Sequence, residues 1–577
     1  MKGRGLSDQQ IQDFLSPSLV QIPSPIGSLK DLDIATEILK EARVSKKRVV
    51  VFGDYDVDGT TSTALLTRVL KEWNFNVGYF VPHRVREGYG VTLKAAQALL
   101  EKEPDAKVVV TCDCGVASFE GIEFLKSKNI SVIVTDHHEV PPKRVSADAV
   151  LNPKQKDCSY PDKKLAGVGV AFLLLIGLRR ALDLKEFSLA NYLDLVAIGT
   201  VCDVAELSGA NRVFVKLGLE KLSTTEKMGL QEMLQRLELD RKAVKARDLG
   251  FLIGPRLNAV GRVGEPDIGV KTLLSEDAYE VSNLVSILEK HNTERRAMQD
   301  VQLKHATQLA QKQFLKNPSL KTLVLADASF HLGIVGLLAA KLAEQFQRPT
   351  CVLTELIDEH ALADFEPTTS VLWKGSLRTP TGYHLADALQ EIRKNHPQLL
   401  KSGGGHALAA GVAIEQENLE VFKDAFEIAI ANQTQKAIEV AAEAELDNLE
   451  GITKLISLME PCGNGNPTPL FLVKNFELER VQVMKEIHMK LHGRLKAEAW
   501  SLLHFKSPYV KMFSNLSSDL ASRTLVSIDL LGELSENEWN GNKRIELQLK
   551  DLLEVRVSGK RIEIRKSSDE VSQSQSL

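Results

Sequence analysis

The segment RVVVFGDYDVDGTT (48–61) combines a short apolar run, three acids at alternate positions and a glycine ahead of a helical pattern. The residues after Arg48 are continuously apolar, which is typical of a parallel strand buried on both faces. Similar runs recur as far as residue 151, with helix-period segments such as 60–71 and 117–128 between them. This alternation predicts an α/β domain around a parallel sheet. The predicted strands are 48–52, 77–80, 107–111, 131–135 and 149–151.

The three acids of this segment are Asp54, Asp56 and Asp58. Alternate side chains of an extended segment share one side, so we expect these carboxylates to project together before a helix that starts at Thr60. Three such anions repel one another by about 1–4 kcal/mol per close pair, which favours a bound cation. A D-x-D-x-D-G string also opens an EF-hand calcium loop, but that loop needs a preceding helix and a glutamate at its twelfth position. In this chain a predicted strand precedes the string, and its twelfth position is Leu65. A solvated acidic turn without a ligand is the remaining alternative.

Acids and histidines recur directly after other predicted elements. Asp113 follows the third strand, the sequence Asp136-His137-His138 follows the fourth, and Asp203 follows a helical segment. A single aspartate after a strand is usually a helix N-cap. Recurrence beyond the carboxyl ends of parallel strands, where such sheets bind ligands, instead favours one shared site. Adjacent residues in extended backbone point to opposite sides, so we expect one histidine to bind metal and the other to face a substrate.

The types of ligand indicate a metal and a reaction. Carboxylate oxygens with one or two imidazoles suit Mn²⁺ or Mg²⁺ rather than a thiolate zinc site. Cys112 and Cys114 flank Asp113 without a second cysteine pair nearby, so we expect them to be buried strand-end residues. Two cations about 3.5–4 Å apart would activate a water and offset charge on a phosphoryl group. Phosphodiester hydrolysis fits this set best. The sequence lacks a GxxxxGK[ST] loop and a complete dinucleotide fingerprint, so the usual signals of ATP- or NAD-driven chemistry are missing.

The remainder of the chain changes pattern several times. Residues 216–315 are helical and charged, a second α/β pattern begins with a strand at 321–327, and short strand-like runs after residue 440 are typical of a small antiparallel barrel. We expect a mobile polar tail at the end. The expected organisation is an N-terminal extension at 1–45, a catalytic domain at 46–215, a long helical connector at 216–315, a smaller α/β domain at 316–435, a barrel at 436–560 and the tail at 561–577.

Composition limits the class of protein. The 577 residues suffice for three or four domains at roughly 150 residues each. A net charge of −4 from 72 basic and 76 acidic residues means that local patches or bound metal must hold any polyanion. Six cysteines without a C-x-x-C pair indicate a reducing compartment. The N-terminus lacks the apolar core of a signal peptide, and the longest nearly pure apolar run (168–178) is about half the ~20 residues of a spanning helix. We therefore expect a soluble, cytoplasmic protein.

Two strings in the second α/β region, and one earlier arginine, are suited to phosphate binding. SGGGHALAAG combines glycines with His406, and its backbone N–H groups would form an anion-binding nest or else a tight turn packed against a helix. KGSLRT places Arg378, a fork-shaped cation, beside two hydroxyls. Arg84, in PHRVREGYG, is a comparable candidate, although a single arginine is more often a surface residue.

In this order, the motifs resemble those of the DHH phosphoesterase family over roughly residues 30–557. Motifs similar to its catalytic domain are GDYDVDG (53–59), DCG (113–115), TDHH (135–138) and the segment around Asp203. Motifs similar to its DHH-associated domain are HLGIVGLLAAKL (331–342), KGSLRT (374–379) and GGGHALAAG (403–411). Strings similar to the branch of single-stranded-DNA-specific exonucleases lie at 152–172, 254–265 and 461–471. The resemblance implies an α/β fold in which a long helix joins a parallel-sheet DHH domain to the associated domain, followed by an OB-fold barrel.

The resemblance also implies a role for each matched residue. The implied metal ligands are Asp54, Asp56, Asp58, Asp113, His137 and Asp203. The implied catalytic residues are Asp113, Asp136 and His138, the last beside the scissile phosphate. The implied substrate-binding residues are Arg84, Arg256, Asn258, Arg262, His331, Ser376, Arg378, Gly404, Gly405 and His406. Arg84 and Arg378 fall where relatives hold a 5′ phosphate, and the segment with Arg256 falls along the DNA path.

The function implied by the resemblance is 5′→3′ hydrolysis of single-stranded DNA to mononucleotides with two Mn²⁺ or Mg²⁺ ions, in recombination and repair, including mismatch repair. The barrel would bind the strand by stacking and charge, with Phe505, Tyr509 and Trp539 as candidate platforms. One alternative is a phosphoesterase for short oligonucleotides, cyclic dinucleotides or pyrophosphate, and another is a non-catalytic DNA-binding scaffold. The expected partners are single-stranded DNA and a single-strand-binding protein, with no membrane. A monomer is expected because nothing indicates a coiled coil.

Overall fold

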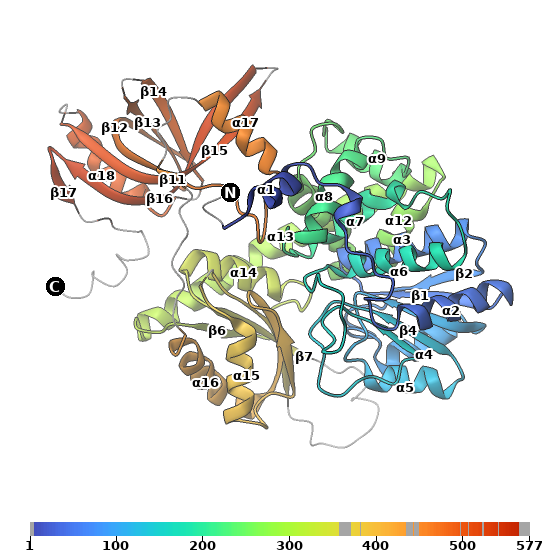
Figure 1. Cartoon of the computed structure of the whole chain (residues 1–577). Coiled ribbons are helices and arrows are strands. Elements are labelled where there is room, and N and C mark those ends of the chain that lie inside the picture. Colours follow the sequence, from blue (N-terminus) through green and yellow to red (C-terminus); the bar gives the residue numbers. More distant parts are fainter. Residues whose placement is uncertain are drawn as a thin grey trace.

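The computed structural model contains a parallel-sheet domain, a second α/β domain and a β-barrel (Figure 1). Helix α13 (Ala278–Lys316) joins the first two, and the barrel follows the second domain along the chain. The α/β class and the C-terminal barrel predicted from the sequence are confirmed. The structure describes residues 5–356, 371–380, 382–433, 442–443, 449–496, 498–505, 507–521, 524–539, 542–562 and 564. The predicted mobile tail lies almost entirely outside these residues.

Five parallel strands form the first sheet in the order β2-β1-β3-β4-β5. The order reverses between β1 and β3, and a crevice opens at such a switch point. Along β1, Val49 and Val51 belong to one core cluster while Val50 and Phe52 belong to another, and all four are fully buried. Burial on both faces therefore explains the continuously apolar sequence. The strands are β1 (Arg48–Gly53), β2 (Val77–Phe80), β3 (Ala106–Cys112), β4 (Ser131–Thr135) and β5 (Ala149–Leu151).

Helices cover both faces of this sheet. α4 and α5 share a core cluster with Val50, and α2, α3, α6 and α7 share one with Val49 on the opposite face. α2 contributes Leu32 and Leu39 to that core, so part of the segment expected as an N-terminal extension is packed into the first domain. The helices are α1 (Asp8–Leu15), α2 (Leu32–Val44), α3 (Val57–Glu72), α4 (Leu93–Lys102), α5 (Phe119–Ser127), α6 (Gly167–Ala181), α7 (Leu193–Cys202) and α8 (Gly209–Leu222), with short 3₁₀ turns at Leu19–Gln21 and Leu189–Tyr192.

The helix after the acidic segment begins earlier than the sequence predicts. α3 starts at Val57 rather than Thr60, because the side chain of Asp56 accepts a 3.0 Å hydrogen bond from the N–H of Gly59 and caps the helix. Asp58 therefore lies in the first helical turn. The expectation of three carboxylates on one extended ribbon was wrong, since Asp54, Asp56 and Asp58 belong to a loop, a cap and a helical turn.

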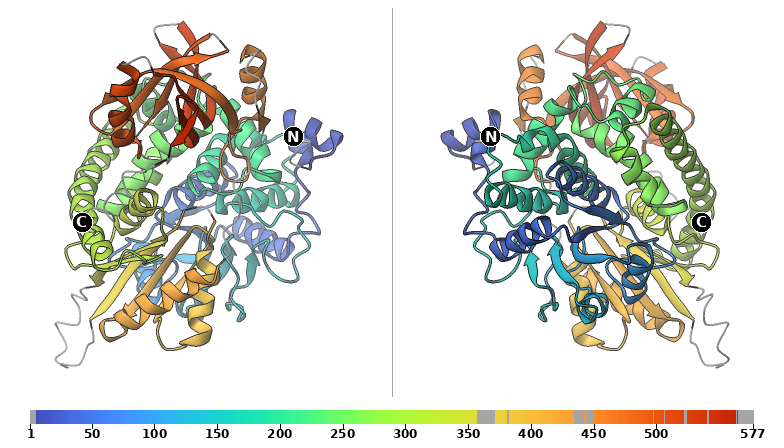
Figure 2. Two further views of the ribbon diagram at one scale, coloured as in Figure 1. Left: turned by 90° about the vertical axis from the view of Figure 1, so that its left-hand side faces the viewer. Right: turned by 90° about the vertical axis from the view of Figure 1, so that its right-hand side faces the viewer.

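Helix α13 leads from the first domain to the second, whereas the shorter helices before it contribute to the core of the first domain, so part of the segment expected as a connector belongs to that domain. Helix α13 spans 39 residues and contributes Val281 and Leu288 to the core of the first domain, and Ala306 and Ala310 to a core of the second. Figure 2 shows it along one edge of the molecule. Neither α13 nor another helix in the described part of the chain is long and apolar enough to cross a membrane. The preceding helices are α9 (Met228–Arg236), α10 (Ala246–Asp248), a π-helical turn (Leu249–Ile253), α11 (Gly254–Val263) and α12 (Asp267–Leu274).

The second domain has a mixed sheet in the order β6-β7-β8-β10-β9, in which only the β6–β7 pair among these described strands is parallel. Helices α14, α15 and α16 pack against it. Its glycine-rich string forms the edge strand β9, whose register is given by Gly404 opposite Gly411. The elements are β6 (Leu323–Ala326), α14 (Val335–Phe346), β7 (Thr350–Leu356), β8 (Leu372–Arg378), α15 (Leu385–Asn395), β9 (Ser402–Gly405), β10 (Ala409–Glu415), a 3₁₀ turn (Gln416–Asn418) and α16 (Leu419–Ala431).

The C-terminal sheet closes into a barrel because β12 pairs with both β13 and β15. The circuit runs β12-β13-β14-β16-β15, and closure removes the exposed strand edges. Phe476, Leu491 and Phe513 lie in its core. The elements are β11 (Ala442–Glu443), α17 (Leu449–Met459), β12 (Phe471–Met484), β13 (His488–Leu495), β14 (Glu498–His504), α18 (Val510–Ala521), β15 (Val526–Trp539), β16 (Asn542–Val557) and β17 (Lys560–Ile562).

A buried ion pair ties the start of α7 to the loop before α9. Lys227 Nζ lies 2.9 Å from Asp194 Oδ1, and the two side chains are 7% and 0% exposed. The hydroxyl of Thr225 donates a 2.6 Å hydrogen bond to the same carboxylate. Because α7 leads directly to Asp203, this pair anchors the helix that carries one of the predicted site residues.

We expect Lys227→Ala to lower the free energy of unfolding by about 3–5 kcal/mol, because the Asp194 carboxylate stays buried without its cation. Chemical denaturation followed by circular dichroism measures the loss. The control Lys185→Ala removes an exposed pair with Asp183, whose side chains are 81% and 77% exposed, and should cost no more than about 1 kcal/mol. Equal losses in the two variants would contradict the prediction.

Candidate metal centre and anion pocket

The acidic segment leaves β1 at the switch point of the sheet. The N–H of Asp54 donates a 3.2 Å hydrogen bond to the carbonyl of Cys112, so the segment passes the end of β3. Asp58 accepts 2.7 Å hydrogen bonds from the N–H groups of Gly167 and Val168 at the start of α6. The positive end of that helix dipole stabilises the carboxylate. Asp58 is thereby held in place by backbone groups about 110 residues further along the chain.

Asp113 comes directly after β3 and faces the same crevice. Its φ of 59° is left-handed, a conformation that aspartate tolerates better than most residues. Its N–H donates a 3.0 Å hydrogen bond to the carbonyl of Thr135, the last residue of β4. A Cβ at Gly167 would lie 2.7 Å from Asp113 Oδ1, so only glycine lets α6 approach this carboxylate so closely.

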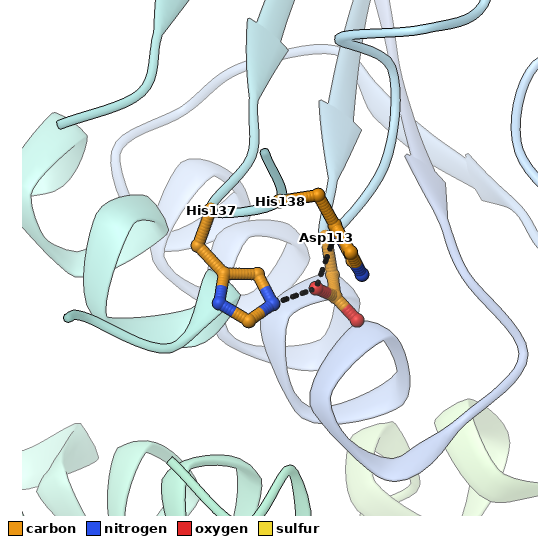
Figure 3. Close-up of side chains that lie close together, drawn as sticks. All are labelled: Asp113, His137 and His138. Carbon is orange, nitrogen blue, oxygen red and sulfur yellow. Dashed lines mark ion pairs between the residues drawn. The ribbon is translucent and has the colours of Figure 1, made fainter. Parts of the chain in front are cut away.

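His137 lies beside Asp113, which follows a different strand (Figure 3), and near Asp203 from the end of α7. Its Nε2 lies 3.1 Å from Asp113 Oδ1 and 3.8 Å from Asp203 Oδ2. Asp203 is the C-cap of α7. The potential ligand atoms lie within 4.8 Å of one another in three sets: Asp54, Asp56 and Asp113; Asp58, His137 and Asp203; and Asp113, His137 and His138.

The buried atoms of this cluster fit a bound cation. Asp54 Oδ1, Asp113 Oδ1 and His137 Nε2 are buried and make no hydrogen bond to the described residues, although the last two atoms lie 3.1 Å apart. Such orphaned polar atoms are rare in native proteins and call for a ligand. Burial, followed by the charge of Asp56, raises the pKa of Asp54 to about 8 and that of Asp58 to about 7. The metal-free cluster is therefore electrostatically strained, and divalent cations would relieve the strain.

The pKa values of two further acids and of His137 also shift toward the neutral form of each group. Burial and then the charge of Asp58 raise the pKa values of Asp113 and Asp203. Burial and then the charge of His138 lower the pKa of His137. A neutral imidazole is the form that binds metal. Oxygen and imidazole donors in this number suit Mn²⁺ or Mg²⁺.

His138 is held differently from its neighbour. Its Nδ1 lies 2.8 Å from Asp136 Oδ1, and Asp136 also accepts hydrogen bonds from the N–H groups of His137, His138 and Val116. Burial lowers the pKa of His138, but the charge and hydrogen bond of Asp136 outweigh burial and raise it to about 9. Asp136 therefore orients His138 and keeps it protonated.

The two histidines do not point to opposite sides as expected. Their ring centroids lie 4.6 Å apart with an interplanar angle of 63°, and both rings border Asp113. The backbone turns after β4, because the Asp136 carboxylate draws in the two following N–H groups. The expectation of extended backbone was wrong, whereas the division into one histidine that binds metal and one that faces the substrate stays a prediction.

Three arginines from separate elements lie near one another beside the acidic cluster, and we call this group, Arg84, Arg262 and Arg378, the anion pocket. Arg84 lies 4.2 Å above the ring of Tyr55, the residue between two of the acids. Arg262, on α11, donates a 2.9 Å hydrogen bond to the carbonyl of Gly333. Burial, then the charges of Arg84 and Arg378, lower the pKa of Arg262 to about 9. Within the described ranges none of these three guanidiniums pairs with a carboxylate, so the pocket is suited to an external anion.

Two further predicted residues border this pocket. Burial and then the charge of Arg84 lower the pKa of His331. A Cβ at Gly336 would lie 3.1 Å from Arg378 Nη2 and 3.3 Å from Ser376 Oγ, which places this hydroxyl and guanidinium beside the same turn of α14. The structure thus groups His331, Ser376 and Arg378 of the second domain with Arg84 of the first.

His406, from the second domain, lies next to the two histidines of the acidic cluster. Its ring lies 5.5 Å from that of His138 and 6.1 Å from that of His137. Burial and then the charge of His138 lower its pKa to about 4. The glycines before it form strand β9 rather than the anion nest or tight turn expected from the sequence, because they pair with β10. A Cβ at Gly405 would lie 2.4 Å from the carbonyl of Ala409, so this pairing requires glycine.

Other predicted residues lie outside these two clusters. Arg256 donates to the carbonyl of Leu252 and lies 4.0 Å from Glu289, whereas Asn258 Oδ1 is buried without a partner among the described residues. Of the candidate stacking platforms, Phe505 is 57% exposed. Tyr509 is 1% exposed and donates a hydrogen bond to Asp551 in the barrel core, so its assignment as a platform was wrong. The side chain of Trp539 lies outside the described residues.

Comparison with known proteins agrees with this geometry. The family model described as "DHH family, N-terminal domain" matches residues 48–200, "DHHA1 domain" matches 318–432 and "RecJ OB domain" matches 440–551. A protein of Dickeya dadantii named single-stranded-DNA-specific exonuclease RecJ is 34% identical over 475 residues, covering 79% of this chain and 80% of that protein. The chain belongs to the RecJ family.

Other RecJ proteins extend the comparison. The Bacillus subtilis RecJ is 32% identical over 532 residues, and this chain spans 63% of its length. The crystal structure of the Thermus thermophilus RecJ in complex with Mn²⁺ matches with a TM-score of 0.73 and 29% identity, over 94% of this chain and 74% of that one. The same protein was also solved with Mg²⁺. Both metals are those that the donor set of this chain favours.

Two residues near His138 were not anticipated. Asn152 follows β5 and donates a 2.9 Å hydrogen bond to the carbonyl of His138, so it repeats the pattern of a polar residue directly after a strand. The Tyr89 hydroxyl lies 3.2 Å from His138 Nε2 and the side chain is 48% exposed. No motif in the sequence indicates a functional role for Tyr89.

The raised pKa values predict how the metal-free protein responds to pH. Asp54 and Asp58 bind protons more tightly when folded than when unfolded, so their contribution to stability is present at low pH and is lost as pH rises through about 7–8. We expect the melting temperature of the metal-free protein to fall between pH 6 and 9, and Mn²⁺ to remove most of this fall. Asp113→Asn should weaken the pH dependence and abolish the stabilisation by Mn²⁺.

The control for this experiment is Asp157→Asn, which removes a carboxylate that is 68% exposed. It should melt like the wild type with and without Mn²⁺. Thermal denaturation across pH, with and without the metal, measures both effects. A pH-independent wild type, or an Asp113→Asn variant that Mn²⁺ stabilises fully, would refute the metal assignment.

Proposed function

We propose that this chain is a metal-dependent 5′→3′ exonuclease that hydrolyses single-stranded DNA to mononucleotides in recombination and repair. The observation that carries the proposal is that an acidic cluster with orphaned ligand atoms adjoins three half-buried arginines, which have no carboxylate partner among the described residues. Tyr55 links the two, since it lies between Asp54 and Asp56 and under Arg84. The names of the RecJ relatives, each a single-stranded-DNA-specific exonuclease, support the substrate.

The arrangement favours release of one nucleotide at a time. A terminal phosphate in the pocket of Arg84, Arg262 and Arg378 would be held by charge-assisted hydrogen bonds. The next phosphodiester linkage would then lie toward the acidic cluster. An end-binding pocket next to the reacting centre explains why cleavage would proceed from an end rather than within the strand. We assign the phosphate to the 5′ end from the resemblance to the family.

The residues of the metal centre have separate roles in binding the metals and the scissile phosphate. Asp54, Asp56, Asp58, Asp113, His137 and Asp203 would hold two Mn²⁺ or Mg²⁺ ions. When bound, the metals supply activation of a water and neutralisation of phosphoryl charge. His138, kept protonated by Asp136, donates a hydrogen bond to the scissile phosphate. His406 closes the site from the second domain.

The remaining assignments follow the same reasoning. The barrel binds the strand beyond the active site, with the exposed ring of Phe505 as a platform. Arg256 and Asn258 line the path toward it. We propose a cytoplasmic monomer that acts on DNA coated by a single-strand-binding protein. A phosphoesterase for short oligonucleotides or cyclic dinucleotides is the alternative, but it leaves the closed barrel without a use.

The direct test uses long oligonucleotides labelled at the 5′ or 3′ end, single-stranded or duplex, with Mn²⁺, Mg²⁺ or excess chelator. We expect the 5′-labelled single strand to release labelled mononucleotides from the start of the reaction. Excess chelator should prevent this release, and the duplex should be cleaved slowly. A dinucleotide turned over as fast as the long strand would favour the alternative. Cleavage that survives chelation would refute the metal mechanism.

The arginine pocket makes a separate prediction. Arg378→Ala should raise KM for a 5′-phosphorylated strand by about 10- to 100-fold, the effect of losing a hydrogen bond between charged groups. KM for a 5′-hydroxyl strand should change little, because no terminal phosphate enters the pocket. The control Arg348→Ala removes a guanidinium that lies 4.8 Å above the ring of Phe314, away from the pocket. Equal effects on both strands would contradict the assignment.

A further inference from the structure

The residue after Asp203 has an unfavourable backbone conformation. Val204 has a φ of +60°, which β-branched residues rarely adopt and glycine adopts freely. Its N–H donates to the carbonyl of Val201 at 3.1 Å, and the N–H of Ala205 donates to that of Thr200 at 3.3 Å. These two bonds form a Schellman motif that ends α7, with valine at the position where glycine is usual. Something outside α7 must therefore stabilise this turn.

The loop that precedes the barrel supplies the missing contacts. The side-chain amide of Asn464 donates a 2.9 Å hydrogen bond to the carbonyl of Val204. The N–H of Leu207 donates a 2.7 Å hydrogen bond to the carbonyl of Asn464 in return. A Cβ at Gly463 would lie 2.8 Å from Leu207, and one at Gly465 would lie 3.0 Å from Glu206. The loop thus fits closely against residues 204–207.

This loop is itself held rigidly. Gly463 and Asn466 exchange backbone hydrogen bonds of 2.9 and 3.1 Å, and the Asn466 side chain donates to the carbonyls of Met459 and Pro461. The guanidinium of Arg212, on α8, donates to the carbonyls of Met459, Glu460 and Pro461. Its other hydrogen bonds reach the carbonyl of Phe14 in α1, which packs beside α17. The loop is therefore anchored to the first domain, and its chain continues into β12 of the barrel.

We propose that Asn464 is a positioning residue for Asp203, a role that rests on the metal centre of the proposed function. Asn464 stabilises the left-handed conformation of Val204 and thereby the Schellman turn at the end of α7. This turn fixes the orientation of Asp203, the C-cap residue of the helix. Asp203 Oδ2 then lies 3.8 Å from His137 Nε2. The string PCGNGNP (461–467) is thus part of the metal centre's support rather than a plain connection to the barrel.

The test compares Asn464→Ala with the double variant Asn464→Ala/Val204→Gly in the full chain. We expect Asn464→Ala to weaken Mn²⁺ binding about tenfold, the lower end of the effect of residues that orient metal ligands. Val204→Gly should restore most of the affinity, because glycine adopts the turn without help. Isothermal titration with Mn²⁺ measures binding without DNA. In turnover, Asn464→Ala should lower kcat and leave KM for long single strands unchanged.

The matched control is Asn432→Ala, which removes an exposed amide that donates one 2.9 Å hydrogen bond to Glu391 in the second domain. It should bind Mn²⁺ like the wild type. Unchanged Mn²⁺ affinity in Asn464→Ala would overturn the proposal, and so would a loss that Val204→Gly fails to restore. If the wild type itself binds no Mn²⁺, the proposed function fails. If the wild type binds and Asn464→Ala binds equally well, only this inference fails.

Discussion

The structure depends on one electrostatic constraint, which is the burial of several carboxylates in a single crevice. Asp54, Asp58, Asp113 and Asp203 are drawn out of water and toward one another, so each raises the free energy of its neighbours' ionised form. A protein tolerates such an arrangement only when a cation or a proton compensates it. The surrounding fold is therefore organised to hold these groups together against their repulsion.

The means of holding them are mostly backbone groups. The start of α6 provides two N–H donors to Asp58, and Gly167 lets the same helix contact Asp113. Three N–H groups and an imidazole fix Asp136. At Asp203 the support is indirect. Asn464, in the loop before the barrel, donates a hydrogen bond to Val204, the residue that follows Asp203. A left-handed valine costs about 1–3 kcal/mol, and the contacts of Asn464 offset part of that cost.

Much of this architecture could be predicted from the sequence. The continuously apolar run at 49–52 signals burial on both faces, and parallel strands with acids at their carboxyl ends predict a shared crevice. What could not be predicted depends on contacts between distant segments. The cap at Asp56 shifts a helix start, β10 turns a glycine string into strand β9, and α18 and the barrel bury Tyr509. The left-handed turn at Val204 contradicts the local preference, so only its tertiary partner explains it.

Helix α13 has a mechanical consequence. With 39 residues it is about 58 Å long at 1.5 Å per residue, and its two ends are embedded in different cores. It therefore connects the two halves of the crevice, with His138 on one side and His406 on the other. A bend in its middle would move one core relative to the other and would change the 5.5 Å separation of the His138 and His406 rings.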